Sequence, residues 1–128
     1  MRHSRIYIAG PMRGKPFFNF PAFDAARDVW IAKGWHVTSP ADLDRFHEDF
    51  DAITANCTGF EAFPPDQFHR CMKRDIEALL DCDAVAFLPG WEHSRGANVE
   101  FQVAKAIGLD LYKVDGSPLF PEMPHVCV

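Results

Sequence analysis

The segment from Asp83 to Leu111 constrains the fold of this chain more than any other part of the sequence. The apolar run from Ala84 to Leu88 is typical of a buried strand, and the Pro-Gly pair that follows ends it. After a polar loop, apolar residues at helical spacing predict a helix from about Gly96 to Ile107. A strand, a loop and a helix start are the usual place for a ligand in an α/β sheet, so we expect a functional site here.

Glu100 interrupts the apolar pattern of this predicted helix. It lies three residues after Ala97 and four before Ala104, on the face that should be buried. Burying a carboxylate is unfavourable unless a partner or a ligand uses it, although the helix dipole favours an anion in the first turn. Glu100 is therefore a candidate functional residue.

Asp75 shows the same anomaly in a second predicted helix, from about Pro65 to Asp81. It falls between Met72 and Leu79 on the apolar stripe of that helix, and both helices flank the same predicted strand. Enzymes that cleave glycosidic bonds use paired carboxylates, of which one attacks or stabilises the sugar and the other donates or accepts a proton. The alternative is a pair of buried acids satisfied by a helix cap or an arginine.

Strands alternate with helices along the chain, which predicts parallel strands joined by right-handed crossovers. We therefore predict one α/β domain over residues 1–128, a three-layer sandwich with a parallel sheet of four to five strands, flavodoxin-like or Rossmann-like. Residues 41–65 show no stable period and are expected to form an irregular excursion with a short helix. The remaining strands are expected at 5–9, 35–38 and 109–114, and a further helix at about 20–33.

Composition and charge exclude several classes of function. A formal net charge of -5 with no basic stripe argues against a nucleic-acid polymer as partner, and no apolar run is long enough to span a membrane. The four cysteines form no CxxC pair, so we expect free thiols in a reducing cytoplasm and no structural metal.

Two loops are candidate anion sites. The Gly-Pro-Met-Arg-Gly loop from Gly10 to Gly14 follows the first predicted strand, where free backbone N–H groups and Arg13 would suit a phosphate. Its glycines are too close for a Walker A loop, and a simple strand-to-helix turn explains it equally well. In the second loop, Ser94 and the residues up to Gly96 could hold a phosphate or hydroxyl group, whereas Ser94 could equally be a helix N-cap.

Taken together, these motifs resemble the nucleoside 2-deoxyribosyltransferase-like family, closest in kind to the 2′-deoxynucleoside 5′-monophosphate N-hydrolases. The resemblance covers most of the predicted fold. It is carried by residues 6–14, by the helical Asp75, by 82–85 and by 94–100.

The resemblance implies a role for each matching residue. Glu100 matches the nucleophile that attacks C1′ of the sugar, Asp75 the acid that assists departure of the base, and Tyr7 the tyrosine beside the nucleophile. A serine at the place of Ser94 resembles the monophosphate hydrolases, since the transferases commonly carry an acidic residue there. The substrate-binding residues implied are Gly10, Met12, Arg13, Gly14, Ser94, Gly96 and Asn98.

The function expected from this resemblance is hydrolysis of the N-glycosidic bond of a small-molecule nucleotide, without metal or redox cofactor, by a homodimer or higher homo-oligomer. Two alternatives remain open at this point. One is a deoxyribosyltransferase, which passes the sugar to another base, and the other is a non-catalytic nucleotide-binding or sensing domain.

Overall fold

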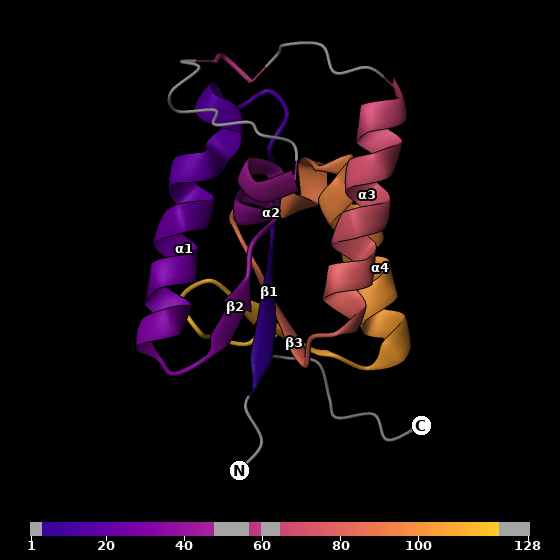
Figure 1. Ribbon diagram of the computed structural model, residues 1–128. Coiled ribbons are helices and arrows are strands. Elements are labelled where there is room, and N and C mark those ends of the chain that lie inside the picture. The colour runs from indigo at the N-terminus through magenta and orange to yellow at the C-terminus, as the bar shows by residue number, and fades with distance from the viewer. Residues whose placement is uncertain (1–3, 48–56, 60–64, 121–128) are drawn as a thin grey trace.

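A computed structural model describes residues 4–47, 57–59 and 65–120 of the 128-residue chain (Figure 1). Four parallel strands form one sheet, in the order β2-β1-β3-β4. The strands are β1 (Arg5–Ala9), β2 (His36–Thr38), β3 (Ala84–Phe87) and β4 (Asp110–Lys113). The helices are α1 (Phe20–Ala32), α2 (Pro40–His47), α3 (Pro65–Leu80) and α4 (Arg95–Ile107), with short 3-10 turns η1 (Pro16–Asn19) and η2 (Trp91–His93).

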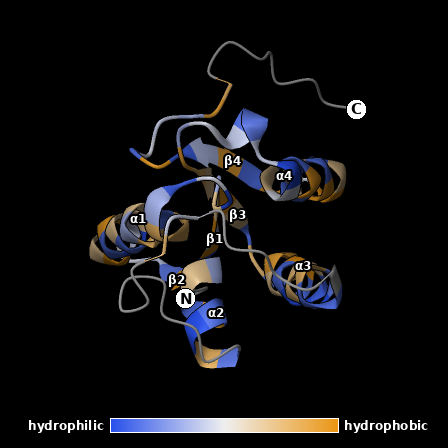
Figure 2. Cartoon of the chain, turned by 90° about the horizontal axis from the view of Figure 1, so that it is seen from above, coloured by the Kyte–Doolittle hydropathy of each residue, from blue (hydrophilic) through white to orange (hydrophobic). Residues whose placement is uncertain are grey.

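Helices cover both faces of this sheet. Figure 2 shows α1 on one face and α3 and α4 on the other. The alternation of β1 explains this arrangement, because Ile6 and Ile8 pack in the core beneath α1, whereas Tyr7 and Ala9 pack with Leu79 of α3. The predicted three-layer α/β fold with a four-stranded parallel sheet is thereby confirmed.

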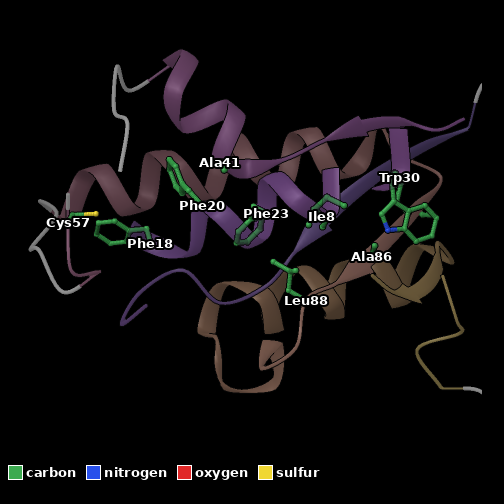
Figure 3. Packing of buried hydrophobic residues seen from close by; sticks show 12 residues of the cluster. Ile8, Phe18, Phe20, Phe23, Trp30, Ala41, Cys57, Ala86 and Leu88 are labelled. Atoms are coloured by element: carbon green, nitrogen blue, oxygen red, sulfur yellow. The ribbon is translucent and has the colours of Figure 1, made fainter. Parts of the chain in front are cut away.

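Aromatic side chains dominate the core beneath α1. Figure 3 shows Phe20, Phe23 and Trp30 packed along one side of α1 toward Ile8. The backbone of β1 also approaches β3 closely at its end, since a Cβ added at Gly10 would lie 2.6 Å from the Cβ of Leu88. A side chain at position 10 would therefore push apart the two strands from which the site is built.

The short helix expected in the 41–65 segment is α2, which begins at Pro40. It lies between α1 and α3 and contacts both (Figure 1). Ion pairs hold it to α1, because Arg45 donates to both carboxylate oxygens of Asp24 at 2.8 and 2.7 Å. The parts of the predicted excursion at 48–56 and 60–64 lie outside the described residues.

No helix in the described part of the chain is both long and apolar enough to cross a membrane. In the described part of the chain, Cys57, Cys71 and Cys82 do not form disulfides.

Candidate functional site

A cavity of about 590 Å³ opens at the carboxyl ends of the strands. The chain crosses from one side of β1 to the other between β2 and β3, so the loops that follow β1 and β3 diverge at this point of the sheet. Both loops line the cavity, together with residues of α1, α2, α3 and α4. The cavity therefore lies where the strand-loop-helix pattern of the sequence predicts a ligand site.

Glu100 lies at this cavity, and its side chain is almost fully enclosed. The residue is 5% exposed, and the Tyr7 hydroxyl donates a hydrogen bond to its Oε2 atom. Burial raises the pKa of Glu100 to about 8; the Tyr7 hydrogen bond lowers it and the charge of Asp75 raises it further. Tyr7 is fully buried in β1, and burial followed by the charge of Glu100 raises the pKa of its phenol. The structure thus brings together two of the predicted catalytic residues.

Asp75, the third predicted catalytic residue, lines the same cavity from α3 and is 8% exposed. Its Oδ1 atom accepts hydrogen bonds from Nε of Arg74 at 3.0 Å and from Nη2 of Arg74 at 2.7 Å. The same Nη2 atom donates to Oδ1 of Asp44 at 2.6 Å. Burial raises the pKa of Asp75 to about 7, whereas the charge and hydrogen bonds of Arg74 oppose that rise. Both carboxyl groups of the site are therefore poised to titrate near neutral pH.

Two guanidinium groups line the cavity as well, one from the loop after β1 and one from the first residue of α4. Arg13 and Arg95 are both exposed, and neither forms a salt bridge with the part of the chain that the structure describes. The Arg95 guanidinium carbon lies 5.9 Å from the centre of the Phe68 ring. The cavity thus combines buried acids with solvent-facing cations, which suits a ligand with an anionic end.

Ser94 is the N-cap of α4, which is one of the two roles that the sequence predicted for it. Its Oγ accepts a hydrogen bond from the backbone N–H of Ala97 at 3.2 Å, and the residue also lines the cavity. Of the other predicted substrate-binding residues, Gly10, Met12 and Gly96 line the cavity as well.

Gly14 and Asn98 do not line the cavity. The backbone N–H of Gly14 donates to the Gly59 carbonyl at 2.8 Å, so it joins the loop after β1 to residue 59. The side-chain amide of Asn98 donates to the carbonyls of Glu92 and Ser94 at 2.8 Å each. Asn98 therefore fixes the shape of the loop that presents Ser94, and its effect on a ligand would be indirect.

Sequence reasoning missed two charged residues of the site, Asp44 and Arg74, and it included Arg95 only as part of the 94–96 loop, without a role for its guanidinium group. Arg95 carries a weak signal, because it stands between Ser94 and Gly96 at the start of a predicted helix. Arg74 carries none, since helical spacing directs residues adjacent in sequence to different faces. Among the described residues, no group of three or more His, Cys, Asp or Glu side chains could hold a metal ion.

In a comparison with protein families, residues 4–113 match the family described as "Domain of unknown function (DUF4406)". The matched range contains the four strands and every cavity-lining residue named above. A comparison with curated proteins finds no match.

Proposed function

Because this chain belongs to DUF4406, a family whose description names no activity, we propose its function from the chemistry of the cavity. The proposed reaction is hydrolysis of the N-glycosidic bond of a 2′-deoxynucleoside 5′-monophosphate, giving free base and 2-deoxyribose 5-phosphate. The observation that carries the proposal is the enclosure of Glu100, hydrogen-bonded by Tyr7, at the same cavity as Asp75.

The two carboxyl groups supply the two roles that glycosidic cleavage requires. Glu100 attacks C1′ as the bond to the base nitrogen breaks, and the electron pair of that bond leaves with the base. Asp75 gives its proton to the departing base. Water then attacks C1′, releases the sugar phosphate from Glu100 and returns a proton to the pair. The Tyr7 hydroxyl supports this assignment because its hydrogen bond favours the ionised form of Glu100.

The cationic side of the cavity supports a nucleotide rather than a nucleoside. Arg13 and Arg95 offer donors to a phosphate, and the start of α4 presents backbone N–H groups with a favourable dipole. The Ser94 oxygen accepts from Ala97, which leaves the hydroxyl proton for a phosphate oxygen. A carboxylate at position 94 would instead repel a dianionic phosphate.

Apolar and aromatic side chains form another part of the cavity wall and suit a planar base. Aromatic rings stack on heterocycles, and a pocket of this size accommodates a ligand of nucleotide dimensions. These side chains are Met12, Phe18, Phe23, Phe68 and Met72. We expect a preference for deoxyribose, since a 2′-hydroxyl would crowd the edge that the nucleophile approaches.

The test is a turnover assay over the deoxy- and ribonucleoside 5′-monophosphates, with the free nucleosides beside them and chromatographic quantitation of free base. The proposal expects base release from at least one deoxynucleotide and its loss in Glu100→Ala. Glu77→Ala, at an exposed glutamate of α3 outside the cavity, is the matched control and should retain turnover. Circular dichroism confirms that both variants fold.

Other results would redirect or reject the proposal. Release only from nucleosides would reject the phosphate site at Arg13, Arg95 and Ser94. Transfer to an added free base in excess of hydrolysis would identify a deoxyribosyltransferase. Saturable nucleotide binding without release from any substrate would reject the reaction and leave a sensing domain.

A further inference from the structure

Arg74 lies behind the cavity wall, between two carboxylates that line it. Asp44 and Asp75 are both lining residues, whereas Arg74 is not. One nitrogen, Nη2 of Arg74, donates to Asp44 at 2.6 Å and to Asp75 at 2.7 Å, and Nε adds a second bond to Asp75 at 3.0 Å. The side chain of Arg74 is 15% exposed, so solvent screens these contacts only weakly. A single guanidinium therefore joins α2 to α3 at the wall of the site.

Among the described residues, the groups that interact electrostatically with Asp75 are mostly acidic. From its own helix it faces Arg74, and from α2 it faces Asp44. From the opposite side, Glu100 on α4 and Tyr7 on β1 interact with its charge. Among the described residues, Asp75 thus faces one cation, Arg74, and two further carboxyl groups, an arrangement that favours a proton on Asp75 or Glu100.

Arg74 and Asp44 act on Asp75 in opposite directions. Burial is the largest influence and raises the pKa of Asp75, Arg74 lowers it by its charge and hydrogen bonds, and Asp44 raises it by its negative charge. Because Arg74 shares one nitrogen between the two acids, a stronger bond to one weakens its hold on the other.

We propose that Arg74 is a positioning residue whose bond, shared between Asp44 and Asp75, decides whether Asp75 carries a proton at neutral pH. This inference rests on the proposed function insofar as the proton on Asp75 is the one that the departing base receives. A base that presents an acceptor atom to Asp75 favours the protonated form against the pull of Arg74. Asp44 also favours the protonated form of Asp75, because its negative charge offsets part of the positive charge of Arg74.

The test is the titration of the Asp75 side-chain carboxyl, followed by its ¹³C chemical shift in protein labelled at aspartate and assigned with Asp75→Asn. In Arg74→Gln the midpoint should rise by about one to three pH units, because an opposite charge in contact is removed. In Asp44→Asn it should fall, since a like charge is removed and the Nη2 atom of Arg74 no longer bonds a charged Asp44. Arg70→Gln removes a guanidinium from an exposed site on the same helix, outside the cavity, and should leave the midpoint unchanged.

Opposite shifts distinguish this role from a structural one, because simple loosening of the wall would move both midpoints in the same direction. An unchanged midpoint in Arg74→Gln, or shifts of equal sign in the two variants, would overturn the inference. If Arg74→Gln does not fold, the test rests on Asp44→Asn alone. A raised or unchanged midpoint of the Asp75 titration in that variant overturns the inference. The titration needs no substrate, so it stands apart from the turnover assay: absence of base release rejects the proposed function, whereas the shifts decide the role of Arg74.

Discussion

Replacement of Glu100 by glutamine should stabilise the protein, and increasingly so as the pH rises. Glutamine retains an oxygen that accepts from the Tyr7 hydroxyl but never carries a charge. In the folded protein, burial makes Glu100 hold its proton more tightly than it does in the unfolded chain. The free energy of unfolding therefore declines as the pH rises from the unfolded pKa to the folded one, and this decline should be absent in Glu100→Gln.

The size of the effect follows from the burial of Glu100. Its pKa rises from 4.5 to about 8, and the residue is only 5% exposed, so solvent screening reduces the effect little. At ~1.36 kcal/mol for each pKa unit, the ionised carboxylate lowers the free energy of unfolding by roughly 5 kcal/mol above pH 8. The variant and the wild type should be nearly equal in stability below pH 4.5, where the side chain is neutral in both states.

Urea unfolding followed by circular dichroism at pH 4, 7 and 9 measures these free energies. Glu77→Gln, at an exposed position of α3, is the matched control and should stay within about 0.5 kcal/mol of the wild type at each pH. A stability difference between Glu100→Gln and the wild type that does not grow with pH would refute the reasoning, as would a variant less stable than the wild type at pH 9.

Three further predictions concern turnover. The rate should show a bell-shaped pH dependence with limbs near pH 7 and 8, because cleavage needs one proton on the pair of Glu100 and Asp75, which holds two below this range and none above it. Tyr7→Phe should move the limb near pH 8 to higher pH and lower kcat about tenfold, since Glu100 loses a donor to its ionised form. Arg13→Ala and Arg95→Ala should each raise KM about tenfold or more for nucleotides and leave that for nucleosides unchanged, as initial rates over a substrate series would show.

The fold and the two buried acids could be predicted from the sequence because periodicity reports them directly. A helix that packs on a sheet must carry apolar residues on one face, so a carboxylate at that spacing is visible as an exception. Glu100 and Asp75 are both buried at one cavity, as the sequence led us to expect. Ser94 is visible for a similar local reason, since it is a preferred N-cap directly before a helical pattern.

The parts that the sequence did not reveal depend on long side chains and tertiary ion pairs. α2 was expected only as an unplaced short helix, because ion pairs such as Arg45 with Asp24 hold it on α1 and leave little apolar period to detect. Asp44 reaches the cavity only because α2 lies between α1 and α3. Arg74 joins the site through a flexible side chain that bends back to its sequence neighbour Asp75, a contact that no spacing rule anticipates.

The most direct test of the central claim is whether Glu100 forms a bond to the sugar. A 2′-fluoro-2′-deoxyarabinonucleoside 5′-monophosphate should trap this intermediate, because the fluorine destabilises the oxocarbenium-like transition state through which water releases the sugar. Mass spectrometry of the digested protein should then find one sugar phosphate on the peptide that contains Glu100. Release of the base from this analogue while that peptide keeps its unmodified mass would contradict the account.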